Sequence, residues 1–173
     1  IVRGAASLQY GTQFGGLINF VLKEPPNKKI DAVIRNTIGS NNQYTNFTSI
    51  GGKKNKFSFY TFYNHKRGDG FRNNSNYKSN NVYVHLKQNL SNKSELSGEV
   101  TYMNYLAKQA GGLSDRMFIN NPLQSNRSRN WFELDWLLYN FKFKHRFNEK
   151  TNLSFSLFGL DAERNTVGFR TNR

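Results

Sequence analysis

Hydrophobic and polar residues alternate with a period of two along most of the chain after residue 30. The segment 81–90 shows this clearly, because Val82, Val84 and Leu86 alternate with tyrosine and polar residues. A period of two is the mark of a β-strand that has one apolar and one polar face. The same pattern predicts seven strands, at 31–40, 43–52, 56–65, 81–90, 95–108, 137–147 and 151–160. We therefore expect an all-β protein.

The connections between these predicted strands differ in length. Those at 40–42, 52–55, 91–94 and 148–150 are short, whereas those at 67–79 and 109–131 and the segment from 165 onward are long. Apart from the first connection, short and long alternate. This alternation is typical of an up-and-down barrel with tight turns on one side of a membrane and long loops on the other. A soluble sandwich would show Greek-key connections instead. Because seven strands would leave unpaired edges in lipid, we expect part of a larger transmembrane antiparallel β-barrel.

Composition changes this picture in two ways. The net charge is +14, which suggests an anionic partner such as nucleic acid, a lipid headgroup surface or a small acidic ligand. The mean hydropathy of −0.74 resembles that of a soluble protein, but barrels give the same value because their lumen and loops are polar. Aromatic residues near the strand ends predict a girdle at the bilayer interface, made of Tyr60, Tyr63, Tyr102, Tyr105, Trp131 and Trp136.

The first 26 residues carry a glycine-rich motif of the form R-G-x-x-S-x-x-Y-G followed by G-G-x-I-N. Its residues are Arg3, Gly4, Ser7, Tyr10, Gly11, Gly15, Gly16, Ile18 and Asn19. This motif resembles the last part of the plug domain of TonB-dependent outer-membrane receptors. Pro25 and Pro26 would end the plug strand, because proline donates no ladder hydrogen bond. The expected domains are 1–26, the C-terminal part of the plug, and 27–173, the first barrel strands.

Two stretches are similar to the ferric citrate (iron dicitrate) receptors within that family. One is the opening segment, including Gln13 after the Y-G-x step, and the other is the long connection at 109–131 with its G-G-L-S start. The resemblance implies a barrel of about twenty-two strands around a plug. It also implies a receptor in the bacterial outer membrane that imports a ferric chelate, either ferric citrate or a similar anionic siderophore. Its partners would be the TonB–ExbB–ExbD energy-coupling complex, membrane lipid and lipopolysaccharide. Iron would be carried as substrate, and no resident cofactor is expected.

Arginines on the predicted long loops are the candidate ligand-binding residues. An arginine side chain matches a carboxylate with two parallel hydrogen bonds, so a ring of them would hold an anionic chelate. Together with Gln13, the candidates are Arg116, Arg127, Arg129, Arg164 and Arg170. The same arginines could instead pair with lipopolysaccharide phosphates or remain solvated.

Enzymatic chemistry has no support in the sequence. His65, His85 and His145 lie on separate predicted strands without metal-ligand spacing, and no nucleophile elbow or phosphate-binding loop occurs. We expect neither a catalytic nor a metal site.

Two other functions remain open. One is a basic aromatic domain that binds single-stranded nucleic acid, which would place aromatic and basic residues on one face of a strand. In 137–147 the aromatic residues are instead predicted to lie opposite Lys142, Lys144 and Arg146. The other is an outer-membrane porin or adhesin without a plug, against which the opening motif argues.

Overall fold

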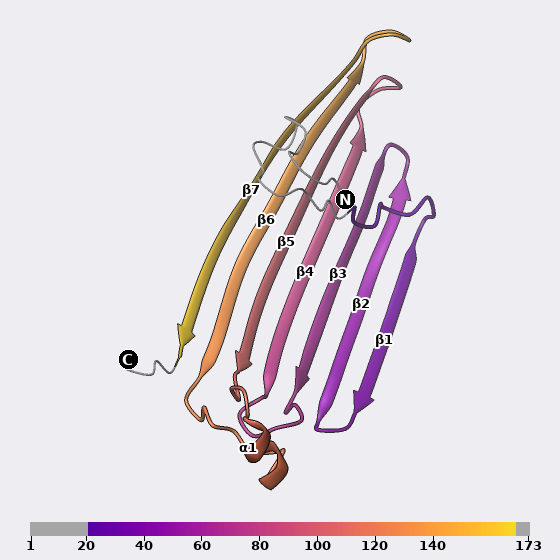
Figure 1. The fold of residues 1–173 in the computed structure, drawn as a ribbon. Helices are drawn as coiled ribbons and strands as arrows, with labels where there is room; N and C mark the ends of the chain where they lie inside the picture. The colour runs from indigo at the N-terminus through magenta and orange to yellow at the C-terminus, as the bar shows by residue number, and fades with distance from the viewer. Residues whose placement is uncertain (1–20, 169–173) are drawn as a thin grey trace.

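The computed structural model describes residues 21–168. They form one antiparallel sheet of seven strands, and neighbours in the chain are neighbours in the sheet (Figure 1). The strands are β1 (Asp31–Gly39), β2 (Gln43–Lys54), β3 (Phe57–Gly68), β4 (Tyr77–Asn89), β5 (Ser94–Lys108), β6 (Trp131–Arg146) and β7 (Asn152–Val167). One short helix, α1 (Asp115–Asn120), lies between β5 and β6. The all-β prediction is confirmed, and the sheet is open, with β1 and β7 at its edges.

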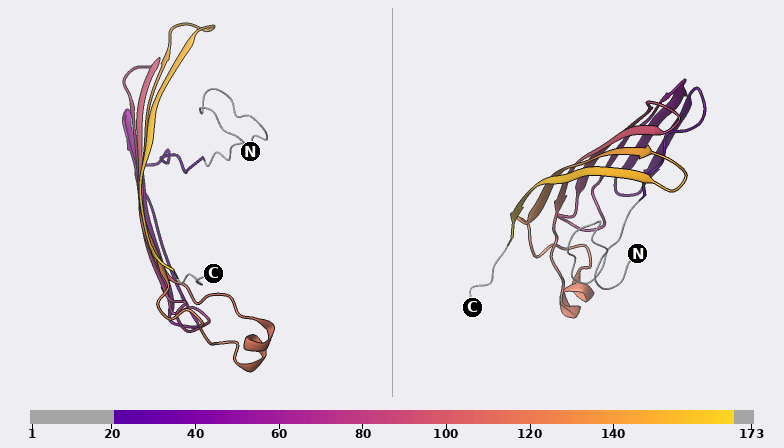
Figure 2. Two further views of the ribbon diagram at one scale, coloured as in Figure 1. Left: turned by 60° about the vertical axis from the view of Figure 1, so that its left-hand side comes forward. Right: turned by 90° about the horizontal axis from the view of Figure 1, so that it is seen from above.

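The sheet is a single curved layer. Seen nearly edge-on, the segment 21–30, which we call the linker, and the loop that carries α1 both lie on the side toward which the sheet curves (Figure 2). The connections at 69–76 and 109–130 leave one end of the strands, which we call the long-loop end. The other end carries short turns. The up-and-down order therefore agrees with the prediction. The alternation of short and long connections agrees as well, apart from the short first turn at 40–42, which lies at the long-loop end.

Several strands are longer than predicted, and β6 shows why. The pattern predicted a start at residue 137, but the strand begins at Trp131. Phe132, Leu134 and Trp136 have the parity opposite to Leu137 and Phe141, so the apolar side chains change face within the strand. The strand continues through this change, but the alternation of apolar and polar residues that begins at Leu137 does not extend back beyond it. The strand therefore extends farther toward the long-loop end than the apolar pattern does.

The cross-strand register assigns every strand residue to one of two faces. One, the apolar face, carries most of the exposed hydrophobic side chains of the strands: Ile34, Ile38, Ile50, Phe57, Tyr63, Val82, Leu86, Leu96, Tyr102, Leu137, Tyr139, Phe141, Leu153, Phe155, Leu157 and Val167. The other, the polar face, carries the linker and a run of charged and hydroxyl side chains that includes Lys87, Glu95, Glu99, Lys142, Lys144 and Ser156. The predicted separation of Lys142, Lys144 and Arg146 from Tyr139, Phe141 and Phe143 is confirmed, whereas Phe132 and Trp136, earlier in β6, lie on the same face as the lysines.

Aromatic residues follow this division, which corrects the predicted girdle. Tyr63 and Tyr102 lie on the apolar face, and their hydroxyls donate hydrogen bonds to Asn80 (2.8 Å) and Asp135 (3.1 Å). Each ring thus has one apolar and one polar end. Of the other predicted girdle residues, Trp131 shares the apolar face, whereas Tyr60, Tyr105 and Trp136 lie on the polar face.

Glycines within the strands are covered by aromatic rings from the neighbouring strand. The register pairs are Gly51 with Tyr60, Gly52 with Phe59, Gly68 with Tyr77, Gly98 with Phe141 and Gly159 with Tyr139. A Cβ on Gly98 would lie 3.2 Å from the Phe141 ring. A ring laid over a glycine supplies the packing that the missing side chain cannot.

Hydrophobic burial is slight among the described residues. Tyr60, Tyr83 and Ala110 are the buried hydrophobic side chains there. The one helix in the described range is too short to cross a membrane. A sheet of this kind leaves its apolar face without a covering layer of protein within residues 21–168.

Some predictions lie outside the described residues. These are the plug motif at Arg3, Gly4, Tyr10, Gly11, Gly15, Gly16 and Asn19, and the ligand candidates Gln13 and Arg170.

Candidate functional site

The linker is attached to the polar face by charge and by close packing. The Lys23 ammonium lies 4.7 Å from the centre of the Tyr60 ring and 3.7 Å from an Asp31 carboxylate oxygen. Glu24 forms an ion pair with Lys87 (3.6 Å). These contacts hold the linker against β1, β3 and β4 in the half of the sheet nearer the short turns.

The Glu24–Lys87 pair belongs to a longer charge network on the polar face. Lys87 also contacts Glu95 at 2.9 Å, and Lys144 contacts the other Glu95 oxygen at 3.7 Å. The side chains of Lys87 and Glu95 are about three-quarters covered, so these contacts are only partly screened by water. One carboxylate thereby links β4, β5 and β6.

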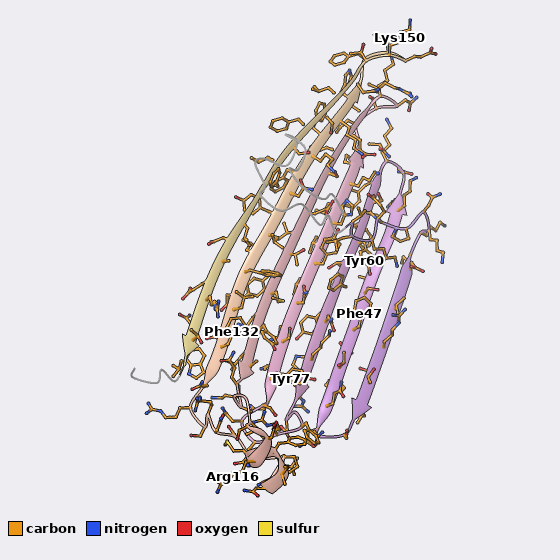
Figure 3. All side chains as sticks on the ribbon, in the orientation of Figure 1. Phe47, Tyr60, Tyr77, Arg116, Phe132 and Lys150 are labelled. Atoms are coloured by element: carbon orange, nitrogen blue, oxygen red, sulfur yellow. The ribbon has the colours of Figure 1, made fainter. Side chains whose placement is uncertain are left out.

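An aromatic cluster lies beside this network on the same face. Phe62 and Tyr83 are 5.4 Å apart between ring centres, and Tyr60 packs 6.2 Å from Tyr83. Tyr83 is 1% exposed, and its hydroxyl donates a hydrogen bond to Glu99. His85 is 3% exposed and lies 3.9 Å from the same carboxylate. Figure 3 labels Tyr60, together with Phe47, which packs on Phe62.

A groove of about 580 Å³ opens between the linker and the last two strands. Its apolar lining includes Leu22, Leu138, Phe158 and Leu160. The last three are the exposed hydrophobic strand residues that do not lie on the apolar face. Lys142 and Lys144 line the groove as well.

At the long-loop end, Arg72 joins the two long loops. Its guanidinium donates to the carbonyl oxygens of Gly111 (2.8 Å), Gln124 (2.9 and 3.0 Å) and Ala110 (3.4 Å). The side chain comes from the 69–76 loop, and all three carbonyls belong to the 109–130 loop. The guanidinium of Arg72 therefore donates its hydrogen bonds to backbone carbonyls of the same protein.

Asn74 makes the second connection between the same loops. Its side-chain amide donates to the carbonyl oxygens of Gln109, Arg127 and Asn130. Its φ of 55° lies in the left-handed region, which asparagine tolerates better than most residues. The backbone N–H of Asn73 adds a hydrogen bond to the Leu123 carbonyl (3.0 Å).

The 109–130 loop is also organised internally. Ser114 caps α1 by accepting a hydrogen bond from the Met117 N–H. The side chain of Gln124 donates to the carbonyls of Met117 (2.6 Å) and Asn121 (3.0 Å), which fastens the helix to the rest of the loop. The sequence did not predict this helix, because one helical turn shows no hydrophobic periodicity.

The predicted arginines lie at the long-loop end, but in different settings. Arg116 is exposed on α1, beyond the strand ends and opposite Lys150 at the short-turn end (Figure 3). Arg129 is exposed on the same loop, and Arg127 is half-buried with its guanidinium donating to the Asn126 carbonyl (3.0 Å). Arg164 was expected on or beside the long segment from residue 165 onward. The strand runs farther than predicted, to Val167, so Arg164 lies within β7 on the polar face, 4.9 Å from the centre of the Phe132 ring.

The roles of Arg72 and Asn74 were not recognised from the sequence. Both are ordinary polar loop residues, and their partners are backbone carbonyls more than thirty positions away. No sequence motif marks such partners. Within residues 21–168, no group of three or more histidine, cysteine or acidic side chains is arranged to hold a metal ion.

Comparison with known proteins adds no identification. No protein-family model matches the chain, and no curated protein matches its sequence.

Proposed function

We propose that this chain is part of an outer-membrane, TonB-dependent receptor that actively imports a ferric chelate, with ferric citrate or a similar anionic siderophore as cargo. The sheet would be a section of a transmembrane barrel of about twenty-two strands. Its polar face would line the lumen, and its apolar face would contact lipid. The chain would act as a transporter and not as an enzyme.

The observation that carries this proposal is the division of the sheet into two faces. On the apolar face, the hydrophobic band of β3 runs from Phe57 to Tyr63, which is about 20 Å along a strand at roughly 3.3 Å per residue. Outer-membrane barrels carry an apolar band of comparable height, about 25 Å, with aromatic residues at its borders. A water-soluble sheet of this size would be expected to bury such a face under a second layer.

The position of the linker favours the presence of a plug. It lies on the polar face, and its charged side chains pair with Asp31 and Lys87 on the wall. A segment that leads from a plug inside the lumen to the first barrel strand must cross that face. The opening motif and the linker position therefore favour a receptor over a plug-less porin or adhesin.

A nucleic-acid-binding sheet is less consistent with the geometry. The polar face does combine basic residues with an aromatic cluster. However, Tyr60 is 5% exposed and Tyr83 is 1% exposed, so neither ring offers a free surface on which a base could stack. The exposed aromatic rings of β6, Tyr139 and Phe141, lie on the opposite face from the lysines. Phe158 is the one exposed aromatic ring that the described strands place on the polar face, beside Lys142 and Lys144 in the groove, and a single ring does not form a row of stacking positions.

The cargo is proposed from charge and from the loop resemblance. Arg116, Arg127 and Arg129 belong to one loop at the long-loop end, which would face the cell exterior. Their guanidinium groups suit the carboxylates of a citrate complex. Other anionic siderophores, haem, cobalamin, peptides and glycans are the competing cargoes.

Titration of the purified intact receptor with ferric citrate tests both the class and the cargo. Charge-assisted hydrogen bonds contribute roughly 1.5–3 kcal/mol each. The double substitution Arg127→Ala and Arg129→Ala is therefore expected to weaken binding by about a hundredfold or more. A matched control removes two positive charges from the short-turn end, with Lys54→Ala and Lys150→Ala, and should bind as tightly as the unchanged receptor.

Three results would change the proposal in different ways. Unchanged affinity in the arginine double variant would remove this pair from the binding site. Binding of haem or cobalamin without binding of ferric citrate would replace the cargo and keep the transporter class. Recovery of the intact protein in the soluble fraction would overturn the membrane assignment itself.

A further inference from the structure

The 69–76 and 109–130 loops are joined by several side-chain hydrogen bonds to backbone carbonyls. Arg72 and Asn74 together reach the carbonyls of six residues of the long loop: Gln109, Ala110, Gly111, Gln124, Arg127 and Asn130. These carbonyls lie near both ends of that loop, so the two side chains draw its ascending and descending arms together. We call this set of contacts the loop clamp.

We infer that Arg72 and Asn74 are positioning residues, which join the two loops into one rigid unit that presents Arg116, Arg127 and Arg129 to the ligand. The inference rests on the proposed function, because it concerns the site proposed for the anionic chelate. It adds two residues to that site that act through backbone carbonyls and not by contact with the cargo.

Arg72 is suited to this role by the shape of its side chain. The guanidinium donates from Nε and from both terminal nitrogens, and its acceptors belong to three different residues. A lysine ammonium has a single nitrogen and cannot reach the three carbonyls in the same fixed geometry. Because all three nitrogens of its guanidinium already donate to carbonyls, we assign no ligand contact to Arg72 itself.

The clamp would increase affinity by ordering the loop before the ligand arrives. A long loop without strand partners loses conformational freedom when it closes around a ligand, and that loss weakens binding. If the clamp is broken, only a fraction of molecules holds the loop in its binding arrangement. The apparent dissociation constant then rises by the inverse of that fraction.

A second consequence concerns motion. Two loops joined in this way move as one body or not at all. Any closure of this part of the long-loop end over the cargo would therefore have to move both loops together.

The test uses the intact receptor with ferric citrate as the probe. Arg72→Ala and Arg72→Lys should each weaken binding at least tenfold. Arg67→Ala is the matched control, since Arg67 lies nearby on the apolar face and its guanidinium packs on the Tyr44 ring; its affinity should change less than twofold. Heat-dependent mobility on a gel shows whether each variant has a folded barrel. If Arg72→Ala does not fold, Asn74→Gly removes the amide donor and keeps the left-handed backbone.

A covalent rescue separates positioning from general loss of structure. The chain has no cysteine, and the backbones of Asn73 and Leu123 are in direct hydrogen-bond contact. The pair Asn73→Cys and Leu123→Cys, added to Arg72→Ala and oxidised, should restore affinity to within threefold of the unchanged receptor. Reduction of the disulfide should remove the rescue. Unchanged affinity in Arg72→Ala, or no rescue by a disulfide shown to have formed, would overturn the inference.

A cargo-independent measurement decides the case in which the receptor does not bind ferric citrate. Trypsin cleavage after Arg127 and Arg129 should then be at least tenfold faster in Arg72→Ala than in either the unchanged receptor or Arg67→Ala. Equal cleavage rates would overturn the loop clamp. Faster cleavage without ferric citrate binding would retain the clamp and overturn only the proposed cargo.

Discussion

Replacement of Phe141 by arginine tests which face of the sheet contacts lipid. Phe141 lies on the apolar face of β6, half exposed at 49%, and its ring covers Gly98 of β5. An aromatic side chain buries about 150–250 Å², so roughly 100 Å² of Phe141 would be in contact with lipid. At about 25 cal/mol per Å², the loss of that contact costs about 2.5 kcal/mol.

The arginine itself adds a second cost. A lipid-facing arginine near the bilayer centre destabilises a barrel by about 2–4 kcal/mol. Phe141→Arg should therefore lower the free energy of unfolding by about 4.5–6.5 kcal/mol in total. The control is Asn140→Arg, the same change at the adjacent residue, whose side chain lies on the polar face opposite Glu99. The new arginine can pair with that carboxylate, so the change should be within about 1 kcal/mol.

The assay is a urea titration of the intact receptor in lipid bilayers, with the folded fraction read from gel mobility of unheated samples. The two substitutions lie at adjacent positions of the same strand. Any destabilisation that arises from placing an arginine in this part of β6, whichever face it lies on, is therefore the same in both variants. Equal losses in both variants, or a larger loss in Asn140→Arg, would refute the assignment of the two faces.

Two further changes probe the polar face. Glu95→Gln removes the ion contacts to Lys87 (2.9 Å) and Lys144 (3.7 Å). It should lower the free energy of unfolding by about 1–2 kcal/mol in the same titration. The control is Glu149→Gln in an exposed short turn, which should have no measurable effect. A loss of the same size for both would argue against the charge network. Gly51→Val should displace the linker, because a Cβ at Gly51 would lie 2.7 Å from the Pro26 ring. Trypsin should then cleave after Lys23 and Lys28 faster than in the unchanged receptor. The control is Gly112→Val, where no atom lies within 4 Å of the new Cβ and cleavage at these sites should not change. Identical cleavage rates would show that the linker does not rest on Gly51.

The sequence by itself determined the class of the fold and the number of strands in the described part. Alternation of side chains reports the two faces of a strand directly, because successive residues point to opposite sides of a sheet. All seven predicted strands are present, and the opposite placement of Phe141 and Lys142 was readable from their parity. The lengths of the connections gave the up-and-down order, since short turns join only adjacent antiparallel strands.

The tertiary structure decided how far each strand extends and which aromatic residues share a face. In β6 the hydrophobic parity reverses between Trp136 and Leu137, and only the hydrogen bonds to β5 and β7 show that the strand continues. Across strands, the same register shows that Tyr63, Tyr102 and Trp131 share one face, whereas Tyr60, Tyr105 and Trp136 share the other.

The candidate site depended on tertiary structure most of all. Arginine-rich loops were visible in the sequence, but the different settings of Arg164 and Arg72 were not. Arg72 binds backbone carbonyls, which every residue carries, so its partners leave no trace in residue type. Alternation is a local property that a chain displays along its length, whereas a contact between distant loops exists only after the strands have brought their ends together.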